Sequence, residues 1–197
     1  MNTWFTSDLH FEHERLINLG GRPFESVDHW NEHILDAINS RVMRADRLFI
    51  LGDFAWHRPG YWRQQIRCRH VELILGNHDN ENKCRKVFGG SCYRQRMTKM
   101  NGVRVFMSHF PNAFWDLSHR GSLHCYGHTH AQREDTLDTT WPERRSMDVG
   151  PDNAARLTGE WRPFSGQEVI ERLMARKGHD LPEFYHEFQR NLAEERS

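Results

Sequence analysis

Six short apolar runs, each four to six residues long, constrain this chain more than any other feature of its sequence. They cover residues 3–7, 47–51, 71–75, 103–108, 123–126 and 146–149. Each run contains β-branched or aromatic residues and ends in small or polar ones, which favours buried strands over helices. Because helical patterns lie between the runs, the chain is expected to belong to the α/β class.

Three segments carry helix signals. Apolar side chains recur at three-to-four-residue spacing over residues 27–38, behind a capping residue at Ser26. Ser165 and Glu168 form a capping-box pattern that opens a second helix. A third helix is expected to begin at Asp180, and its apolar face would either pack on the core or contact a second copy of the chain.

The remaining segments contain loops and no linker. Residues 111–122 and 131–145 are predicted to be loops, with proline and glycine as breaks. We find no internal repeat or low-complexity tract. We therefore expect one domain over residues 1–197, with C-terminal helices at about residues 165–196 packed on it.

Five consecutive apolar runs end in carboxylate, amide or imidazole groups. These groups are Asp8, His10, Asp53, Asn77, His78, Asp79, His109, His128 and His130. In a sheet layered with helices, sites form in the crevice outside the carboxyl ends of the strands, so these side chains are expected to converge. Glycine precedes Asp53, Asn77 and His128, and it allows close backbone approach beside the ligand.

This combination of side chains predicts a metal centre. A buried cluster of such groups without a cation would leave polar atoms that are costly to satisfy. Oxygen and nitrogen ligands without thiolate suit Mn, Fe, Zn, Ni or Co. One carboxylate can bridge two cations, and Asp53 is central in the order of the chain. Two ions ~3.5–4 Å apart would clamp phosphoryl oxygens and hold a bridging hydroxide for in-line attack.

The strand ends form an ordered series of motifs: D-x-H at 8–10, G-D at 52–53, G-N-H-D at 76–79, H at 109 and G-H-x-H at 127–130. Over about residues 3–150, this series resembles the calcineurin-like metallophosphoesterase superfamily. It is similar to small single-domain bacterial and phage phosphoesterases, which also tend to show the D-x-H-F-x-H and H-R-G-S-x-H stretches found here at 8–13 and 119–124. The resemblance implies a four-layer αββα sandwich, in which two mixed β-sheets are flanked by helices.

The resemblance also implies roles for single residues. One metal is assigned to Asp8, His10 and His130, the other to Asn77, His109 and His128, with Asp53 bridging. His78 matches the family histidine that stabilises or protonates the leaving-group oxygen, and Asp79 is expected to orient His78 through a hydrogen bond. Many relatives carry a further Asp three residues after the bridging one. Here that residue is Trp56, and the protein-phosphatase signatures are absent too, so dephosphorylation of protein Ser or Thr is disfavoured.

Further candidates for substrate binding, each with a competing structural role, are His13, His57, Arg58, Trp115 and His124. His13 would face the substrate or hydrogen-bond its own helix start. His57 and Arg58 would lie at the rim, where the guanidinium fork suits phosphate. Trp115 would stack on a base or pack in the core, and His124 would support the metal ligands or be buried. Asp148 would orient His128 or His130, or cap its strand.

Composition says less about function. Lys plus Arg equals Asp plus Glu at 27 each, although residues 56–104 hold eleven basic and three acidic side chains. That asymmetry predicts either an anionic substrate near this segment or a solvated basic surface. The four cysteines form no C-x-x-C pair, which is typical of ordinary thiols in a reducing compartment. With no signal-peptide pattern and no apolar run near ~20 residues, we expect a cytoplasmic protein without membrane contact.

We therefore predict a dinuclear metal-dependent phosphoester hydrolase, foremost a phosphodiesterase acting on nucleotide, nucleic-acid or small phosphodiester substrates. The expected cofactors are two divalent ions (Mn, Fe, Ni or Zn), with Mn favoured. The alternatives are a phosphomonoesterase for small metabolites and a non-catalytic scaffold of the same fold. The scaffold is disfavoured because every expected ligand and His78 are present. The sequence leaves open whether the chain is a monomer or a homodimer.

Overall fold

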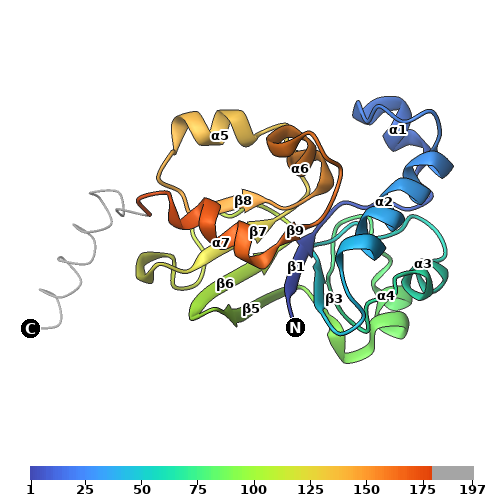
Figure 1. Cartoon of the computed structure of the whole chain (residues 1–197), viewed down its shortest axis with the longest axis horizontal. Helices are drawn as coiled ribbons and strands as arrows, with labels where there is room; N and C mark the ends of the chain where they lie inside the picture. The colour runs from blue at the N-terminus through green and yellow to red at the C-terminus, as the bar shows by residue number, and fades with distance from the viewer. Residues whose placement is uncertain (179–197) are drawn as a thin grey trace, which may run out of the picture.

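Two mixed β-sheets form the centre of the molecule (Figure 1). A computed structural model describes residues 1–178. The strands of the first sheet are β1 (Thr3–Thr6), β2 (Arg47–Ile50), β3 (His70–Ile74), β4 (Cys92–Tyr93) and β9 (Phe164–Ser165), in the order β4-β3-β2-β1-β9. Those of the second are β5 (Gln95–Met100), β6 (Val103–Ser108), β7 (Leu123–Tyr126) and β8 (Ser146–Asp148), in the order β5-β6-β7-β8. Strands β9 and β5 pair antiparallel, and the other neighbours pair parallel.

All six predicted runs form strands, within one residue of the expected bounds. Parallel strands that are covered on both faces need nearly continuous apolar sequence, which is why these runs stood out. In β2, for example, Phe49 packs between the sheets, while Leu48 and Ile50 pack against helices. Strands β4, β5 and β9 were not predicted. Two of them have only two residues, and the side chains of β5 are half-exposed or exposed.

The two sheets pack face to face through a shared apolar core. Its side chains come from β1, β2 and β3 on one side and from β6, β7 and β8 on the other: Phe5, Phe49, Ile74, Val105, Met107, Leu123, Cys125 and Met147. Helices α6 (Pro151–Thr158) and α7 (Gly166–Met174) add Ala154, Val169 and Leu173 to this core. Helix α7 begins as predicted, because the Ser165 side chain accepts a hydrogen bond from the Glu168 N–H at 3.1 Å.

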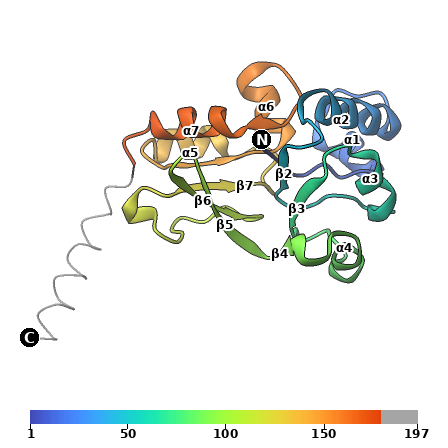
Figure 2. The same cartoon turned by 60° about the horizontal axis from the view of Figure 1, so that its bottom comes forward.

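Helices cover the other face of the first sheet. In both views, α1 (Glu14–Gly20), α2 (Val27–Arg41), α3 (Pro59–Gln65) and α4 (Glu81–Phe88) gather beside this sheet (Figure 1, Figure 2). Helix α2 has the predicted cap, in which Ser26 accepts from the His29 N–H at 3.1 Å. Its apolar face supplies Trp30, Ile34 and Ile38 to the outer core.

Helix α5 (Glu134–Thr140) covers the outer face of the second sheet and completes the four layers. It lies within 131–145, where a loop was predicted. That prediction is wrong because α5 has no apolar stripe and is held by tertiary contacts. Buried Glu134 accepts hydrogen bonds from the Tyr126 hydroxyl and from Arg144 Nη2.

The described residues leave two predictions open. No helix within residues 1–178 is long and apolar enough to cross a membrane. The helix expected from Asp180 lies outside the described residues. Its packing and the single domain over residues 1–197 therefore stay predictions.

The carboxyl ends of strands from both sheets meet at one place. Backbone hydrogen bonds join the Asp8 N–H to the Gly52 carbonyl (2.9 Å) and the Gly127 N–H to the His109 carbonyl (3.0 Å). Across the two sheets, the His128 N–H donates to Asp8 Oδ2 at 2.9 Å. The predicted strand-end groups are therefore brought together.

Candidate metal centre

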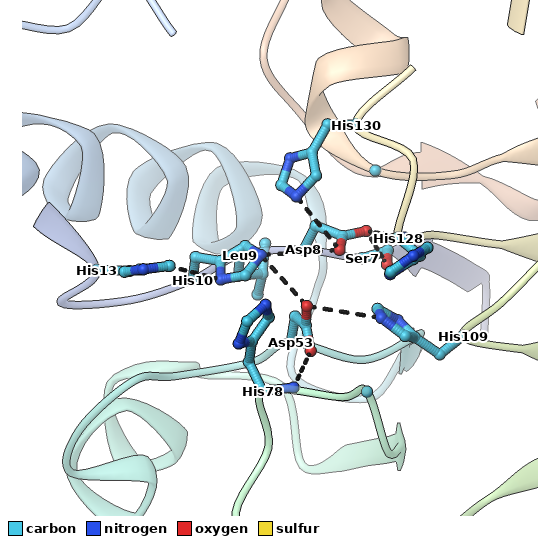
Figure 3. A network of polar contacts seen from close by, with 12 residues as sticks. Ser7, Asp8, Leu9, His10, His13, Asp53, His78, His109, His128 and His130 are labelled. Atoms are coloured by element: carbon cyan, nitrogen blue, oxygen red, sulfur yellow. Dashed lines mark hydrogen bonds and ion pairs between the residues drawn. The ribbon is translucent and has the colours of Figure 1, made fainter. Parts of the chain in front are cut away.

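Carboxylate and imidazole groups converge where these strand ends meet (Figure 3). Among the described residues, two overlapping triads place their ligand atoms within 4.8 Å of one another. One triad is Asp8, His10 and His130, called the Asp8 set below; the other is Asp8, Asp53 and His109. Figure 3 shows the two carboxylates at the centre with the imidazoles around them.

The spacing of these atoms fits a shared cation better than hydrogen bonds. His10 Nε2 lies 3.4 Å from Asp53 Oδ2, and His130 Nε2 lies 3.7 Å from Asp8 Oδ1. Ligand atoms held at about 2.1 Å by one ion would themselves be separated by roughly 3–3.5 Å. Asp8 Oδ1 and His10 Nε2 are buried and have no hydrogen-bond partner, which is costly for polar atoms. A divalent ion would satisfy both atoms, so the residues present fit one.

A second group of side chains meets at the amide oxygen of Asn77. His109 Nε2 and His128 Nδ1 each lie 3.0 Å from Asn77 Oδ1. The other nitrogen of His109 lies 2.8 Å from the Leu51 carbonyl, which can only accept, so His109 Nδ1 donates to it and Nε2 is the nitrogen that would bind a metal. Asn77, His109 and His128 are called the Asn77 set below.

Asp53 lies between the two sets. Its Oδ1 accepts a hydrogen bond from the His78 N–H at 2.9 Å. Its Oδ2 lies 3.4 Å from His10 Nε2 and 3.5 Å from His109 Nε2. One Asp53 oxygen therefore faces a member of each set, which is the position required of a bridging carboxylate.

Two glycines allow Asp53 and His109 to approach so closely. A Cβ on Gly76 would lie 2.1 Å from Asp53 Oδ1, and one on Gly52 would lie 2.2 Å from His109 Nδ1. Both distances are far below van der Waals contact. Gly52 also has a φ of +97°, a conformation that disfavours side chains. The glycines of the G-D and G-N-H-D motifs are thus required by the packing of the cluster.

Backbone strain concentrates at the same side chains. Of the ten non-glycine residues with positive φ among those described, half belong to the cluster: Asp8, His10, Asp53, His128 and His130. Such conformations cost on the order of 1 kcal/mol or more each and gather at functional sites.

Burial favours the neutral form of the His10 imidazole. It lowers the pKa of His10 far below the usual range, and the charge of His130 adds to this effect. Neutral imidazole is the form that binds metals. Burial also raises the pKa of Asp53, and a nearby cation would favour its ionised form. The electrostatics of the cluster therefore favour a bound cation.

Comparison with known families agrees with this geometry. A family model described as the calcineurin-like phosphoesterase superfamily domain matches residues 1–142. The chain belongs to this superfamily. The resemblance seen in the motif series is confirmed, and so is the predicted fold.

Several known proteins are similar to this chain in sequence or in fold. The chain is 27% identical over 150 residues to an uncharacterized protein of Methanocaldococcus jannaschii, covering 74% of this chain and 79% of that one. It is 28% identical over 191 residues to the gene 66 protein of Mycobacterium phage L5, covering 79% and 89%. A solved structure of a protein of unknown function from Aquifex aeolicus has the same fold, with a TM-score of 0.69, 22% identity, and 86% and 98% of the two chains covered.

Asp79 does not hold His78 as predicted. Its Oδ2 accepts from the backbone N–H groups of Gly76 (2.8 Å) and Asp53 (2.9 Å), and its Oδ1 accepts from Phe54 (2.9 Å). Burial raises the pKa of Asp79 to about 6. The predicted carboxylate–imidazole hydrogen bond is absent among the described residues. Asp79 instead fixes the backbone around Asp53.

His78 is exposed beside the cluster, among other rings. Its ring centre lies 5.6 Å from that of His10 and 5.4 Å from that of Trp56. Trp56, which stands where many relatives carry Asp, stacks on His13 at 4.2 Å. His13 Nδ1 lies 3.1 Å from His10 Nδ1, and His13 makes no side-chain cap to α1. His13 therefore belongs to the cluster, and the competing role at the helix start does not apply.

His57 and Arg58 are both exposed, and Arg58 is engaged. Exposed Arg58 donates to Glu12 Oε1 from its Nε at 2.6 Å. His57 lines a groove of about 420 Å³ together with Glu12, His13, Arg15 and Trp56. This groove runs beside the His13 end of the cluster.

Trp115 and His124 lie in the packed interior, so the alternative of core packing applies to both, and the alternative that they contact substrate is wrong. The Trp115 indole N–H is directed at Ser122, 3.0 Å from its hydroxyl. His124 is fully buried on β7, and its Nε2 accepts from the Asn112 N–H at 3.1 Å. Burial lowers the pKa of His124 to about 4. An aromatic residue near a ligand in sequence does not reveal which face of the sheet it occupies.

Sequence reasoning missed two residues that support the cluster. Asp152 Oδ2 lies 3.3 Å from His130 Nδ1 and 2.6 Å from Arg22 Nη2, and Arg22 also donates to the Asp8 carbonyl at 2.8 Å. Asp148, considered for this role, instead accepts from Thr129 Oγ1 at 2.9 Å and holds the loop. No motif in the sequence marks Arg22 or Asp152.

Proposed function

We propose that this chain is a dinuclear metal-dependent phosphodiesterase. The observation that carries the proposal is the pair of ligand sets that share Asp53, with buried ligand atoms left without hydrogen-bond partners. Asp8, His10 and His130 would hold one ion, and Asn77, His109 and His128 would hold the other. Oxygen and nitrogen ligands suit several divalent ions, and Mn is the first to test.

When bound, the two ions would supply Lewis acidity at the phosphoryl oxygens and a water of lowered pKa. The chain's own residues position this chemistry. Asp53 would hold the two ligand sets at a fixed separation, while Asp79 fixes the backbone on which Asp53 stands. The carboxylate of Asp152 would keep His130 Nε2 directed toward Asp8.

His78 is proposed to donate a proton to the leaving-group oxygen. It is exposed, lies close to His10, and makes no side-chain hydrogen bond with another described residue. Proton transfer by a positioned side chain contributes typically ~10²–10⁴-fold to a rate. Its effect should grow with the basicity of the leaving group.

The charge around the cluster supports a diester rather than a monoester. A monoester dianion is commonly clamped by arginine or lysine in addition to metal. Two arginines of this region are already engaged: Arg22 is buried against Asp152, and Arg58 pairs with Glu12. Exposed Asn77 and His128 leave the cluster open, so there is room for the second ester arm. Nucleotides, nucleic-acid ends and small phosphodiesters all meet this requirement.

The test is hydrolysis of bis-p-nitrophenyl phosphate and p-nitrophenyl phosphate side by side. Chelated protein would be assayed alone and after addition of Mn, Ni or Zn. We expect metal-dependent turnover of both esters and the higher kcat/KM with the diester. A higher kcat/KM with the monoester would replace the proposal with a phosphomonoesterase. Absence of turnover with every metal, while ions are bound, would favour a non-catalytic scaffold.

A further inference from the structure

A largely apolar cavity of about 410 Å³ lies on the outer side of the second sheet, beneath α5. Its walls include Pro111, Ala113, Thr129, Thr136, Leu137 and Trp141. This volume falls in the range of small-molecule sites, which are mostly apolar with a few polar groups. Two charged residues line the cavity: Arg144 is buried, whereas Arg133 is exposed. The cavity is called the α5 cavity below.

Some residues in the wall of the α5 cavity are close neighbours of the metal ligands in the sequence. Thr129 in its wall stands between two ligand histidines, and Pro111 follows His109 by two residues. The intervening Phe110 is half exposed, and its ring centre lies 4.5 Å from that of His128. Phe110 and Thr129 therefore connect the His128 side of the cluster to segments that form the wall of the cavity.

The opposite side of the cluster differs in character. Figure 3 shows His13 and His128 at opposite ends of the carboxylate pair, with His78 on the side of His10. His78 also lies beside Trp56, whose groove is lined by charged and imidazole groups. If His78 protonates the leaving oxygen, the leaving arm departs on that side, and the retained arm extends toward His128.

We propose that the α5 cavity binds the non-leaving arm of the diester and selects a planar aromatic group there. This inference rests on the proposed function. A flat ring gains from burial against Leu137 and Trp141, whereas a sugar or a short alkyl group would leave its hydroxyls unpaired or the cavity unfilled. An aryl group and a nucleobase share this chemistry.

The experiment compares three diesters with one leaving group. Methyl p-nitrophenyl phosphate, bis-p-nitrophenyl phosphate and the p-nitrophenyl ester of thymidine 5′-phosphate all release p-nitrophenolate, but their retained arms are methyl, aryl and nucleoside. We expect kcat/KM at least about tenfold higher with an aromatic retained arm than with methyl, since burying a ring contributes more than the ~1.4 kcal/mol that equals a tenfold change. Comparison of the nucleoside ester with the aryl diester shows whether the cavity prefers a nucleobase or accepts any aryl group.

Variants that fill the α5 cavity provide the decisive comparison. Thr136 and Ala113 are both exposed in its wall, so Thr136→Trp and Ala113→Trp should fold. Each should lower the ratio of aromatic-arm to methyl-arm kcat/KM by about tenfold. Leu157→Trp, on the exposed face of α6, is the matched control and should leave the ratio unchanged.

Failure of this inference is distinguishable from failure of the proposed function. Turnover of none of the three diesters would overturn the phosphodiesterase itself. Equal kcat/KM for methyl and aromatic arms, or Trp variants that lower all three equally, would overturn the subsite while leaving the phosphodiesterase intact. A preference shown by the nucleoside ester alone would narrow the ligand to a nucleobase.

Discussion

The Asp8 set is buried and supported by further side chains, whereas the Asn77 set is largely exposed. Asp8 and His10 are at most 3% exposed, while Asn77 and His128 lie at the surface. Behind the Asp8 set stands an ion pair of Arg22 and Asp152, whose arginine side chain is fully buried. Behind the Asn77 set, the hydrogen bond from His109 to the Leu51 carbonyl is the main support.

This difference predicts unequal roles for the two ions. Ligands that are buried and oriented by outer hydrogen bonds bind metal more tightly, because little reorganisation is needed. The Asp8 set should therefore hold its ion firmly. The Asn77 set should exchange its ion more readily and should face the incoming substrate. Titration of chelated protein with Mn should accordingly show one tight and one weaker binding step.

Removing the shared ligand should have the largest effect. Asp53→Asn keeps an acceptor for the His78 N–H and suits the left-handed conformation of Asp53, so the fold should persist. We expect weakened binding of both ions and a fall in kcat/KM of about 10³-fold or more. The reason is that bound metal ions stabilise the transition state by several kcal/mol. Metal analysis by mass spectrometry and bis-p-nitrophenyl phosphate hydrolysis would check this. Loss of only one ion would show that Asp53 is not shared.

A smaller effect, confined to the rate, is expected from His78→Ala. His78 belongs to neither set, so both ions should stay bound with unchanged affinity. With an alkyl leaving group kcat should fall about 10²-fold, and with p-nitrophenyl much less, because p-nitrophenolate needs little protonation. His70→Ala, at an exposed position on β3, is the control. If His78→Ala loses an ion, His78 belongs to a ligand set after all.

The ligands could be predicted as a group because every one of them lies just after a strand, and the resemblance divided them into two sets. In a motif such as G-N-H-D, the glycine and the ligand follow the strand within a few residues. The parallel sheet then brings the ends of neighbouring strands together. The supporting pair could not be found in this way. Arg22 and Asp152 are 130 residues apart, and their contact exists only in the folded chain. Neither lies in a motif that predicts metal chemistry.

The same limit explains the errors elsewhere in the fold. Trp115 and His124 are close in sequence to ligands, but alternation along β7 directs His124 to the outer face of the sheet. Helix α5 depends on Glu134 binding Tyr126 and Arg144, which sequence periodicity does not report. Local patterns thus predicted six of the described strands and the metal-binding groups, while the contacts that support those groups required the tertiary structure.

The smallest predicted effect tests that second layer directly. Asp152→Asn removes the carboxylate that orients His130 and neutralises Arg22. We expect about 10–100-fold weaker binding of the tight ion only, since that is the usual effect of losing such a partner. Isothermal titration with Mn would report the two binding steps separately, and thermal unfolding would report the cost of leaving Arg22 unpaired. Asp135→Asn, an exposed carboxylate on α5 paired with Arg156, should alter neither step. Equal weakening of both steps by Asp152→Asn would mean that the two sets share one support, and the contrast between them would not hold.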